Sequence, residues 1–159
     1  MRRRKVGQSM VEMALVLPFL VLITMGIIDS SYYVYIYSEL ENATRHAAER
    51  ASKTPPLSVS NPNDPNDKCA QLAEMEAVDD IFLSSLNRTN IASHITFAFP
   101  NGGGRNIGDQ IEATLTYTGQ FLTPIGRRFF GNALNFRFTS RRTITDTDPP
   151  RGFKPDCST

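Results

Sequence analysis

A single glutamate stands within an apolar run near the N-terminus, and its position defines the chemistry available there. The run from Met10 to Ile28 reads MVEMALVLPFLVLITMGII, and Glu12 is its one charged residue. An acidic side chain at full membrane depth costs about 2.5–3.5 kcal/mol. Glu12 therefore either lies shallow, with its carboxylate among the lipid headgroups, or pairs with a cation.

The residues before Glu12 favour the paired alternative. Glu12 is the fifth residue after Gly7, and Gly7 follows the basic run RRRK at Arg2–Lys5. A basic leader, a glycine, four further residues, a glutamate and an apolar helix form the pattern of type IV prepilins. The stretch GQSMVEMALVLP, from Gly7 to Pro18, more specifically resembles the TadE-like family, the minor pseudopilins of tight-adherence (Flp type IVb) pili.

That resemblance implies a processing site and an assembly contact. A membrane prepilin peptidase would cut after Gly7 and leave Gln8 as the mature N-terminus. The carboxylate of Glu12 would then contact the Gln8 amine of a neighbouring subunit, with a contact inside one chain as the alternative. The partners implied are the membrane, the prepilin peptidase, other pilin or pseudopilin subunits and the pilus assembly platform.

The apolar run is just long enough to span a bilayer core, which needs about 20 helical residues. A cleaved secretory signal would have a shorter core of about 7–15 residues and a small-residue exit, whereas this run continues past Gly26. We therefore expect a retained helix. Basic residues precede the run and Asp29 follows it. The positive-inside rule then places the N-terminus in the cytoplasm and the rest of the chain on the exported face of the cytoplasmic membrane.

Two features of this region allow two interpretations each. Pro18 either kinks the helix or is simply tolerated, since proline is more frequent in spanning helices than in soluble ones. Tyr32, Tyr33, Tyr35 and Tyr37 follow the run directly. They form either an aromatic belt at the outer headgroups or a contact surface between subunits.

The helix is expected to continue beyond the membrane as a spine. No glycine or proline interrupts residues 32–52, and the residues Tyr33, Ile36, Leu40, Ala43, Ala47 and Ala51 recur at spacings of three and four. The stretch ENATRHAAERAS, Glu41–Ser52, again resembles the TadE-like family. A helix from about Val11 to Ser52 would be roughly 60 Å long, with an apolar half followed by a half that has one apolar face.

A loop and a second helix are expected next. Residues 54–67, TPPLSVSNPNDPND, predict the loop. The helix would have Asp64 as its N-cap and Pro65 at its first position, and it would end near Leu86. Its buried stripe would be Leu72, Met75, Val78, Phe82 and Leu86, and its acidic residues Glu74, Glu76, Asp79 and Asp80 would form a solvated face.

Three later segments alternate apolar and polar residues as antiparallel strands do. Their apolar members are Ile91, Ile95, Phe97 and Phe99, then Ile111, Ala113, Leu115 and Tyr117, then Leu134, Phe136 and Phe138. Residues 101–108, NGGGRNIG, join the first two as a hairpin, and residues 117–131, YTGQFLTPIGRRFFG, also resemble the TadE-like pattern. The sequence thus predicts a pilin-like α+β fold: a long N-terminal helix, a second helix, and a small three-stranded antiparallel sheet packed on them.

Cys69 and Cys157 are the only cysteines. They belong to no CxxC motif or Cys/His cluster, so a zinc or redox motif is not indicated. Both are expected on the exported side, where disulfides are permitted. We therefore predict a Cys69–Cys157 bridge, with two free thiols as the alternative.

The remaining composition points away from catalysis and from nucleic acid. The 159 residues carry a formal net charge of +1, with two histidines and no tryptophan, so no global charge attracts nucleic acid. His46 and His94 have no indicated partner, which favours ordinary surface histidines over catalytic bases. No Lys-Ser/Thr pair follows the glycines of 101–108, so a phosphate loop is not indicated. We expect no enzyme activity, cofactor, metal or small-molecule substrate.

The expected organisation is a basic prepilin leader at 1–7, a transmembrane half-helix at 8–30, an exported spine at 31–53 and an exported α+β head at 54–159. The expected function is that of a non-enzymatic minor pilin or pseudopilin that takes part in assembling, priming or capping a tight-adherence pilus. It would reside in the cytoplasmic membrane or in a surface pilus. The alternatives are a membrane-anchored exported binding or scaffold module that does not enter a filament, and an anchored enzyme with an unusual site.

Overall fold

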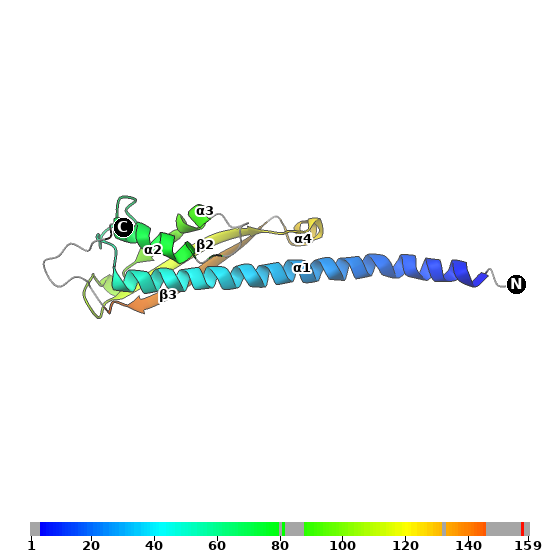
Figure 1. The fold of residues 1–159 in the computed structure, drawn as a ribbon, viewed down its shortest axis with the longest axis horizontal. Helices are drawn as coiled ribbons and strands as arrows, with labels where there is room; N and C mark the ends of the chain where they lie inside the picture. The colour runs from blue at the N-terminus through cyan, green and yellow to red at the C-terminus, as the bar shows by residue number, and fades with distance from the viewer. Residues whose placement is uncertain (1–3, 80, 82–87, 132, 146–156, 158–159) are drawn as a thin grey trace. The chain divides into compact units, whose positions relative to one another are not determined.

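The computed structural model describes residues 4–79, 81, 88–131, 133–145 and 157 (Figure 1). These residues form the helices α1 (Arg4–Lys53), α2 (Lys68–Asp79), α3 (Arg88–Ala92) and α4 (Pro124–Phe130), the 3-10 turn η1 (Pro100–Gly102), and the strands β1 (Ile95–Ala98), β2 (Gln110–Gln120) and β3 (Ala133–Thr143). The strands form one antiparallel sheet in the order β1-β2-β3. The predicted α+β fold, with a long N-terminal helix and a three-stranded antiparallel sheet, is therefore confirmed.

The chain divides into two compact units. The first holds residues 1–36 and 119–134, and the second holds residues 37–118 and 135–159. The first unit contains the apolar part of α1 together with α4. The second contains α2, α3, β1 and the larger parts of β2 and β3.

The first unit is built on an apolar helical surface. α1 runs without interruption through Pro18, although a proline removes one N–H donor from the helix ladder. The hydroxyls of three residues donate to the carbonyl oxygen four residues earlier, at 2.8 Å: Thr24, Ser30 and Ser31. Between Met10 and Ile23 the large apolar side chains are exposed, from 39% at Val21 to 72% at Met10. This surface therefore needs an apolar environment that the first unit does not supply.

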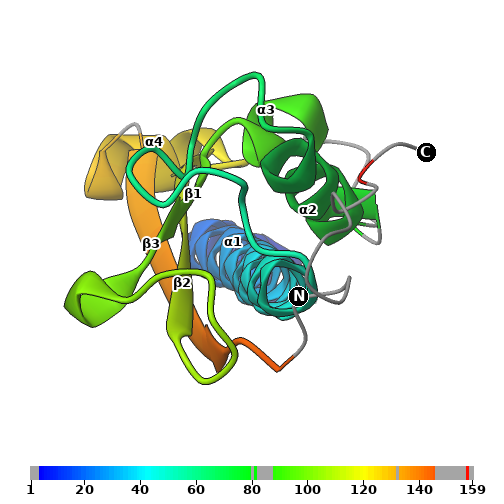
Figure 2. The ribbon, with the colours of Figure 1, turned by 90° about the vertical axis from the view of Figure 1, so that its left-hand side faces the viewer.

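The second unit packs on a face of small residues on α1. The buried residues of this face are Leu40, Ala43, Thr44, Ala47, Ala48 and Ala51. The ring of Tyr37 meets Phe138 of β3 at a centroid distance of 4.9 Å, and Arg50 pairs with Glu76 of α2 at 2.9 Å. Figure 2 shows α2 and the sheet on different sides of this helix. The stripe predicted for the spine is thus buried, apart from Tyr33, which is partly exposed.

The register of the sheet follows from paired residues. Opposite residues of β1 and β2 are Ile95 with Leu115 and Phe97 with Ala113, all of them buried. Side-chain contacts between β2 and β3 join Thr118 to Asn135 at 2.8 Å, Thr114 to Thr139 at 3.3 Å, and Glu112 to Arg141. Along these contacts one residue number falls as the other rises by the same step, as antiparallel neighbours require.

The start of α2 differs from the prediction. The helix is capped by Asp67 rather than by Asp64. The Oδ1 atom of Asp67 accepts hydrogen bonds from the N–H groups of Cys69 and Ala70, at 3.0 and 3.3 Å, and its Oδ2 atom accepts one from the N–H of Leu57 at 2.5 Å. Three donors make the burial of this carboxylate favourable, whereas Asp64 lies in the preceding turn.

The buried face of α2 is also not the predicted one. It consists mainly of small residues: Cys69, Ala70, Ala73, Ala77 and Val78. Val78 was expected there, but Leu72 is partly exposed and Met75 is 57% exposed. The predicted stripe of large residues is therefore wrong at these two positions, and Phe82 and Leu86 lie outside the described residues.

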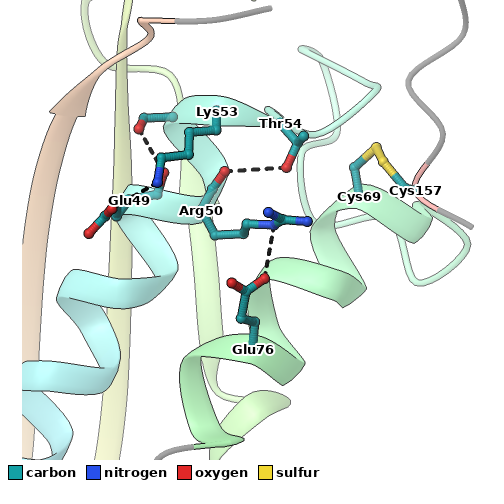
Figure 3. Close-up of polar contacts among 8 residues, drawn as sticks. Glu49, Arg50, Lys53, Thr54, Cys69, Glu76 and Cys157 are labelled. Carbon is teal, nitrogen blue, oxygen red and sulfur yellow. Dashed lines mark hydrogen bonds and ion pairs between the residues drawn. A yellow bond between two sulfur atoms is a disulfide. The ribbon is translucent and has the colours of Figure 1, made fainter. Parts of the chain in front are cut away.

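The acidic residues of α2 differ in their surroundings. Glu76 forms the ion pair with Arg50 (Figure 3). Burial raises the pKa of Glu74 to about 7. The folded state therefore holds the proton of Glu74 more tightly than the unfolded state does. As the pH rises from the ordinary pKa of a glutamate to about 7, the folded state loses stability. Glu74 is thus only partly solvated, whereas Asp80 lies outside the described residues.

A disulfide joins the first turn of α2 to the C-terminal part of the chain. The Sγ atoms of Cys69 and Cys157 are bonded, and their Cα atoms are 5.2 Å apart (Figure 3). This separation is within the usual range for disulfides. The bridge spans a sequence separation of 88 residues, and a loop of this length is worth at most about 4–5 kcal/mol in the chain-entropy account.

We predict that this bridge forms in the purified protein and stabilises it. Replacing Cys69 and Cys157 together by alanine should lower the free energy of unfolding by about 2–4 kcal/mol, measured by chemical denaturation in detergent, and should leave membrane insertion unchanged. Peptide mapping of the wild-type protein without reduction should recover one cross-linked pair. Labelling of both residues by a thiol reagent without prior reduction would contradict the prediction.

Candidate functional site

The residues of the processing motif lie at the start of α1. Gly7 and Gln8 fall within this helix, and Glu12 follows Gln8 by four residues, which places both on one helical face. The side chain of Glu12 is exposed. Residues 1–3 of the leader lie outside the described residues. One helical turn separates the backbone nitrogen of Gln8 from Glu12, so a contact within one chain remains an alternative to a contact between subunits.

The apolar part of α1 is suited to a bilayer. Within the described part of the chain, Ser9–Lys53 is the one stretch of helix long and apolar enough to cross a membrane, and its most apolar window is not buried against the rest of the chain. A single N-terminal apolar helix fits a single-pass membrane protein. The exposed side chains of this window are therefore the surface that lipid or other helices contact.

A buried carboxylate lies at the C-terminal end of the apolar run. Asp29 is only 7% exposed. It accepts two hydrogen bonds from Thr123: one from the backbone N–H at 3.1 Å and one from the hydroxyl at 2.5 Å. The sequence suggested only a flanking charge at Asp29. In the structure, Asp29 forms a tertiary contact with Thr123, which lies far from it in the chain.

Thr123 also begins a short helix that the sequence prediction did not include. Its Oγ1 accepts a hydrogen bond from the N–H of Gly126 at 3.1 Å, and Pro124 follows at the first position of α4. Gly131 ends the helix with a φ of 92°, a conformation that favours glycine. A Thr-Pro start and a glycine end are helix signals, so the sequence did contain the information needed to find α4.

Close packing surrounds the Asp29 carboxylate. A Cβ atom at Gly126 would overlap this carboxylate and would lie 2.7 Å from Cδ1 of Phe121. The ring of Phe121 in turn meets the ring of Tyr33 edge-on, with 4.9 Å between centroids. We call Asp29, Tyr33, Phe121, Thr123 and Gly126 the Asp29 cluster. Tyr33 therefore packs against its own chain, which neither the aromatic belt nor a subunit contact had anticipated.

The histidines and acidic residues are, by residue type, possible metal ligands. Among the residues that the structure describes, no group of three or more His, Cys, Asp or Glu side chains is placed to hold a metal ion. His46 and His94 are both exposed, and Nδ1 of His94 lies 2.7 Å from the carbonyl oxygen of Asn90. The features that stand out are thus the N-terminal motif, the exposed apolar helix and the Asp29 cluster.

Residues 7–49 match the family model described as TadE-like protein. This N-terminal segment is TadE-like. The match begins at Gly7, contains Gln8 and Glu12, and relates this segment of the chain to the TadE-like family. Residues 50–159 lie outside it, and the resemblance proposed for residues 117–131 is not part of the match. Neither the comparison with curated proteins nor the comparison with solved structures finds a match.

We predict that Asp29 holds residues 119–134 against the TadE-like helix. Asp29→Ala would leave the N–H and hydroxyl of Thr123 without their acceptor, at a cost of about 1–3 kcal/mol. Local opening should then be about 5- to 150-fold more frequent. The measurement is the rate of trypsin cleavage after Arg127 and Arg128 in the detergent-solubilised full-length protein.

Ser30→Ala is the matched control, because this hydroxyl donates to the carbonyl oxygen of Gly26 within its own helix. It should be cleaved at the wild-type rate. If Asp29→Ala is also cleaved at that rate, Asp29 does not hold the segment.

Proposed function

We propose that this chain is a non-enzymatic minor pilin or pseudopilin that takes part in assembling, priming or capping a tight-adherence-type pilus. The observation that carries the proposal is the TadE-like match, which begins at Gly7 and continues along an exposed apolar helix. Such a surface requires a bilayer or neighbouring apolar helices around it. A pilin subunit meets the first in the cytoplasmic membrane, as a single-pass protein with an exported head, and the second in the filament.

Processing by a prepilin peptidase after Gly7 is the first step of this function. Cleavage removes the basic residues of the leader, which hold the N-terminus on the cytoplasmic side. It also creates an α-amino group at Gln8, which is mostly protonated near neutral pH. The mature N-terminus then lies within α1 and is able to follow the apolar helix into a bundle of subunits.

Glu12 supplies the opposite charge in that bundle. Among apolar helices a lone amine and a lone carboxylate are each costly, and a close pair offsets part of that cost. We infer that Glu12 contacts the Gln8 amine of a neighbouring subunit and so sets the axial register. The spacing of four residues also permits the contact inside one chain, which would give no information about register.

The processing step is tested by the mass of the mature protein. N-terminal sequencing or intact-mass measurement of membrane-extracted protein should show a chain that begins at Gln8. Gly7→Val should block cleavage, because a bulky side chain replaces the close backbone approach that glycine permits. Gly26→Val is the control, since an added Cβ there meets no atom within 4 Å, and it should be processed normally. A mature chain that begins at Met1, or after Ile28, would overturn the pilin proposal.

The Glu12 contact is tested by co-assembly. Glu12→Gln and Glu12→Ala should leave insertion and folding intact and should reduce the amount of this chain in sheared, purified pili at least tenfold, because breaking a buried pair costs about 3–5 kcal/mol. Glu41→Gln removes an exposed partner of Arg45 and should assemble as the wild type does, since such pairs contribute little. Wild-type recovery of both Glu12 variants, with normal pili, would refute the contact.

A further result separates the two function classes. A chain that is processed after Gly7 and is essential for piliation, yet stays in the membrane fraction, would favour an assembly factor within the same system. A chain that is neither processed nor required for pili would instead favour the membrane-anchored binding or scaffold module.

A further inference from the structure

An apolar groove lies in the first unit, between α1 and residues 119–134, which we call the α4 segment. Its volume is about 1030 Å³. Leu22, Ile23 and Ile27 line it from α1, and Leu134 lines it from the end of the α4 segment. These four side chains are 39–61% exposed. The groove is therefore open, and its apolar walls are accessible to a partner.

The position of the groove along α1 defines its depth. Its α1 residues belong to the apolar run that ends at Ile28, and Leu22 lies about 9 Å before Ile28 along the helix axis at 1.5 Å per residue. Asp29, directly after the run, bonds the α4 segment to α1 through Thr123. With α1 spanning the membrane, the groove lies in the exported leaflet, between the acyl chains and the headgroups.

The α4 segment carries both exposed positive charge and an exposed apolar side chain. Arg127 and Arg128 lie in the last turn of α4 and are exposed. Nε of Arg127 donates to the carbonyl oxygen of Phe121 at 2.9 Å, which orients this guanidinium. Leu122 is 51% exposed, and the sequence of the segment contains no acidic residue. A segment that carries both exposed apolar side chains and arginines is typical of surfaces that bind at the boundary of an anionic membrane.

We propose that the α4 segment is a second membrane contact of this chain, with a phospholipid of the exported leaflet in the groove. The acyl chain lies along Leu22, Ile23 and Ile27, and the phosphate is bound by Arg127 and Arg128, whose guanidinium groups suit phosphate oxygens. The proposal rests on α1 spanning the membrane, and it holds whether or not the chain enters a pilus.

A second copy of the apolar helix is the competing occupant. It would match the apolar walls, but its run from Met10 to Ile28 offers only Glu12 as an anion to face the two arginines. A phospholipid supplies an acyl chain and an anionic phosphate in one molecule. Charge complementarity and the continuity of the groove with the spanning surface therefore favour lipid.

The test uses the full-length protein in nanodiscs that hold one copy each, with a fluorophore on one introduced cysteine. Cys69 and Cys157 are bonded to each other and do not react. Leu122→Cys reports on the α4 segment, and Leu15→Cys reports on the insertion of α1. Ile107→Cys, at an apolar position of the second unit that is 67% exposed, is the matched control. Lipids brominated on the acyl chain near the headgroup quench labels that enter the bilayer.

We expect quenching of the labels at positions 15 and 122 and none at position 107. At position 122, quenching in anionic phosphatidylglycerol discs should exceed that in zwitterionic phosphatidylcholine discs at least twofold, because basic residues near the surface attract anionic lipids. Arg127→Gln combined with Arg128→Gln should abolish that difference. Both side chains are exposed, so this double variant should fold, which circular dichroism checks.

Three outcomes would overturn the proposal. Quenching at position 15 without quenching at position 122 would refute the lipid contact and leave the spanning helix intact. Absence of quenching at both positions would refute the membrane placement on which the contact rests. In discs with two copies, a disulfide between unlabelled Leu122→Cys chains, together with absence of lipid quenching, would identify the second copy as the occupant.

Discussion

An apolar helical surface is stable only when other apolar groups contact it, and the source of those groups changes along α1 near Asp29. Before Asp29 the large apolar side chains are exposed, so they require lipid or other apolar helices. From Leu40 onward the buried face consists mainly of alanines, and α2 and the sheet lie along it (Figure 2). Small side chains let neighbouring backbones approach closely, and a close-packed core tolerates little added volume. One continuous helix thus presents an exposed apolar surface in one half and is part of a protein core in the other.

The Asp29 cluster lies where that change occurs. A buried carboxylate is costly without donors, and Thr123 supplies two of them. The donors reach Asp29 because the chain turns tightly after Thr123 and because Gly126 leaves room where a side chain would collide. The same contact therefore satisfies the charge and holds the α4 segment beside the last apolar turns of α1. A short helix of this kind gains little stability alone, so its placement depends on that tertiary contact.

Local sequence patterns predicted the elements whose signals are contained in one stretch. The apolar run and the amphipathic spacing that follows it, with no break between them, predicted the helix α1. The strict alternation of apolar and polar residues after Gln110 predicted the strand β2. The start of α2 was missed because Asp64 and Asp67 are both plausible caps. The Asp67 carboxylate also accepts a hydrogen bond from the N–H of Leu57 in the preceding loop, a contact that the local sequence does not reveal. Its buried face was missed because alanine carries a weak hydrophobic signal, although close packing against a neighbour favours alanine over a large residue such as Met75. The N-terminal motif is local and was found from the sequence. The Asp29–Thr123 contact joins residues 94 positions apart, and no periodicity connects them.

The two acidic residues at the ends of the apolar run have similar chemistry, but the chain uses them differently. Asp29 obtains its donors from its own chain, so its contribution belongs to the folded monomer. Glu12 lies exposed on α1, and in the proposed function its partner is an amine that exists only after cleavage at Gly7. Attachment of the α4 segment then requires no processing, whereas register between subunits does. In the proposed function, the contact that holds the α4 segment and the contact that sets register between subunits thus lie at opposite ends of one apolar helix, so we expect a change at one end to leave the other contact intact.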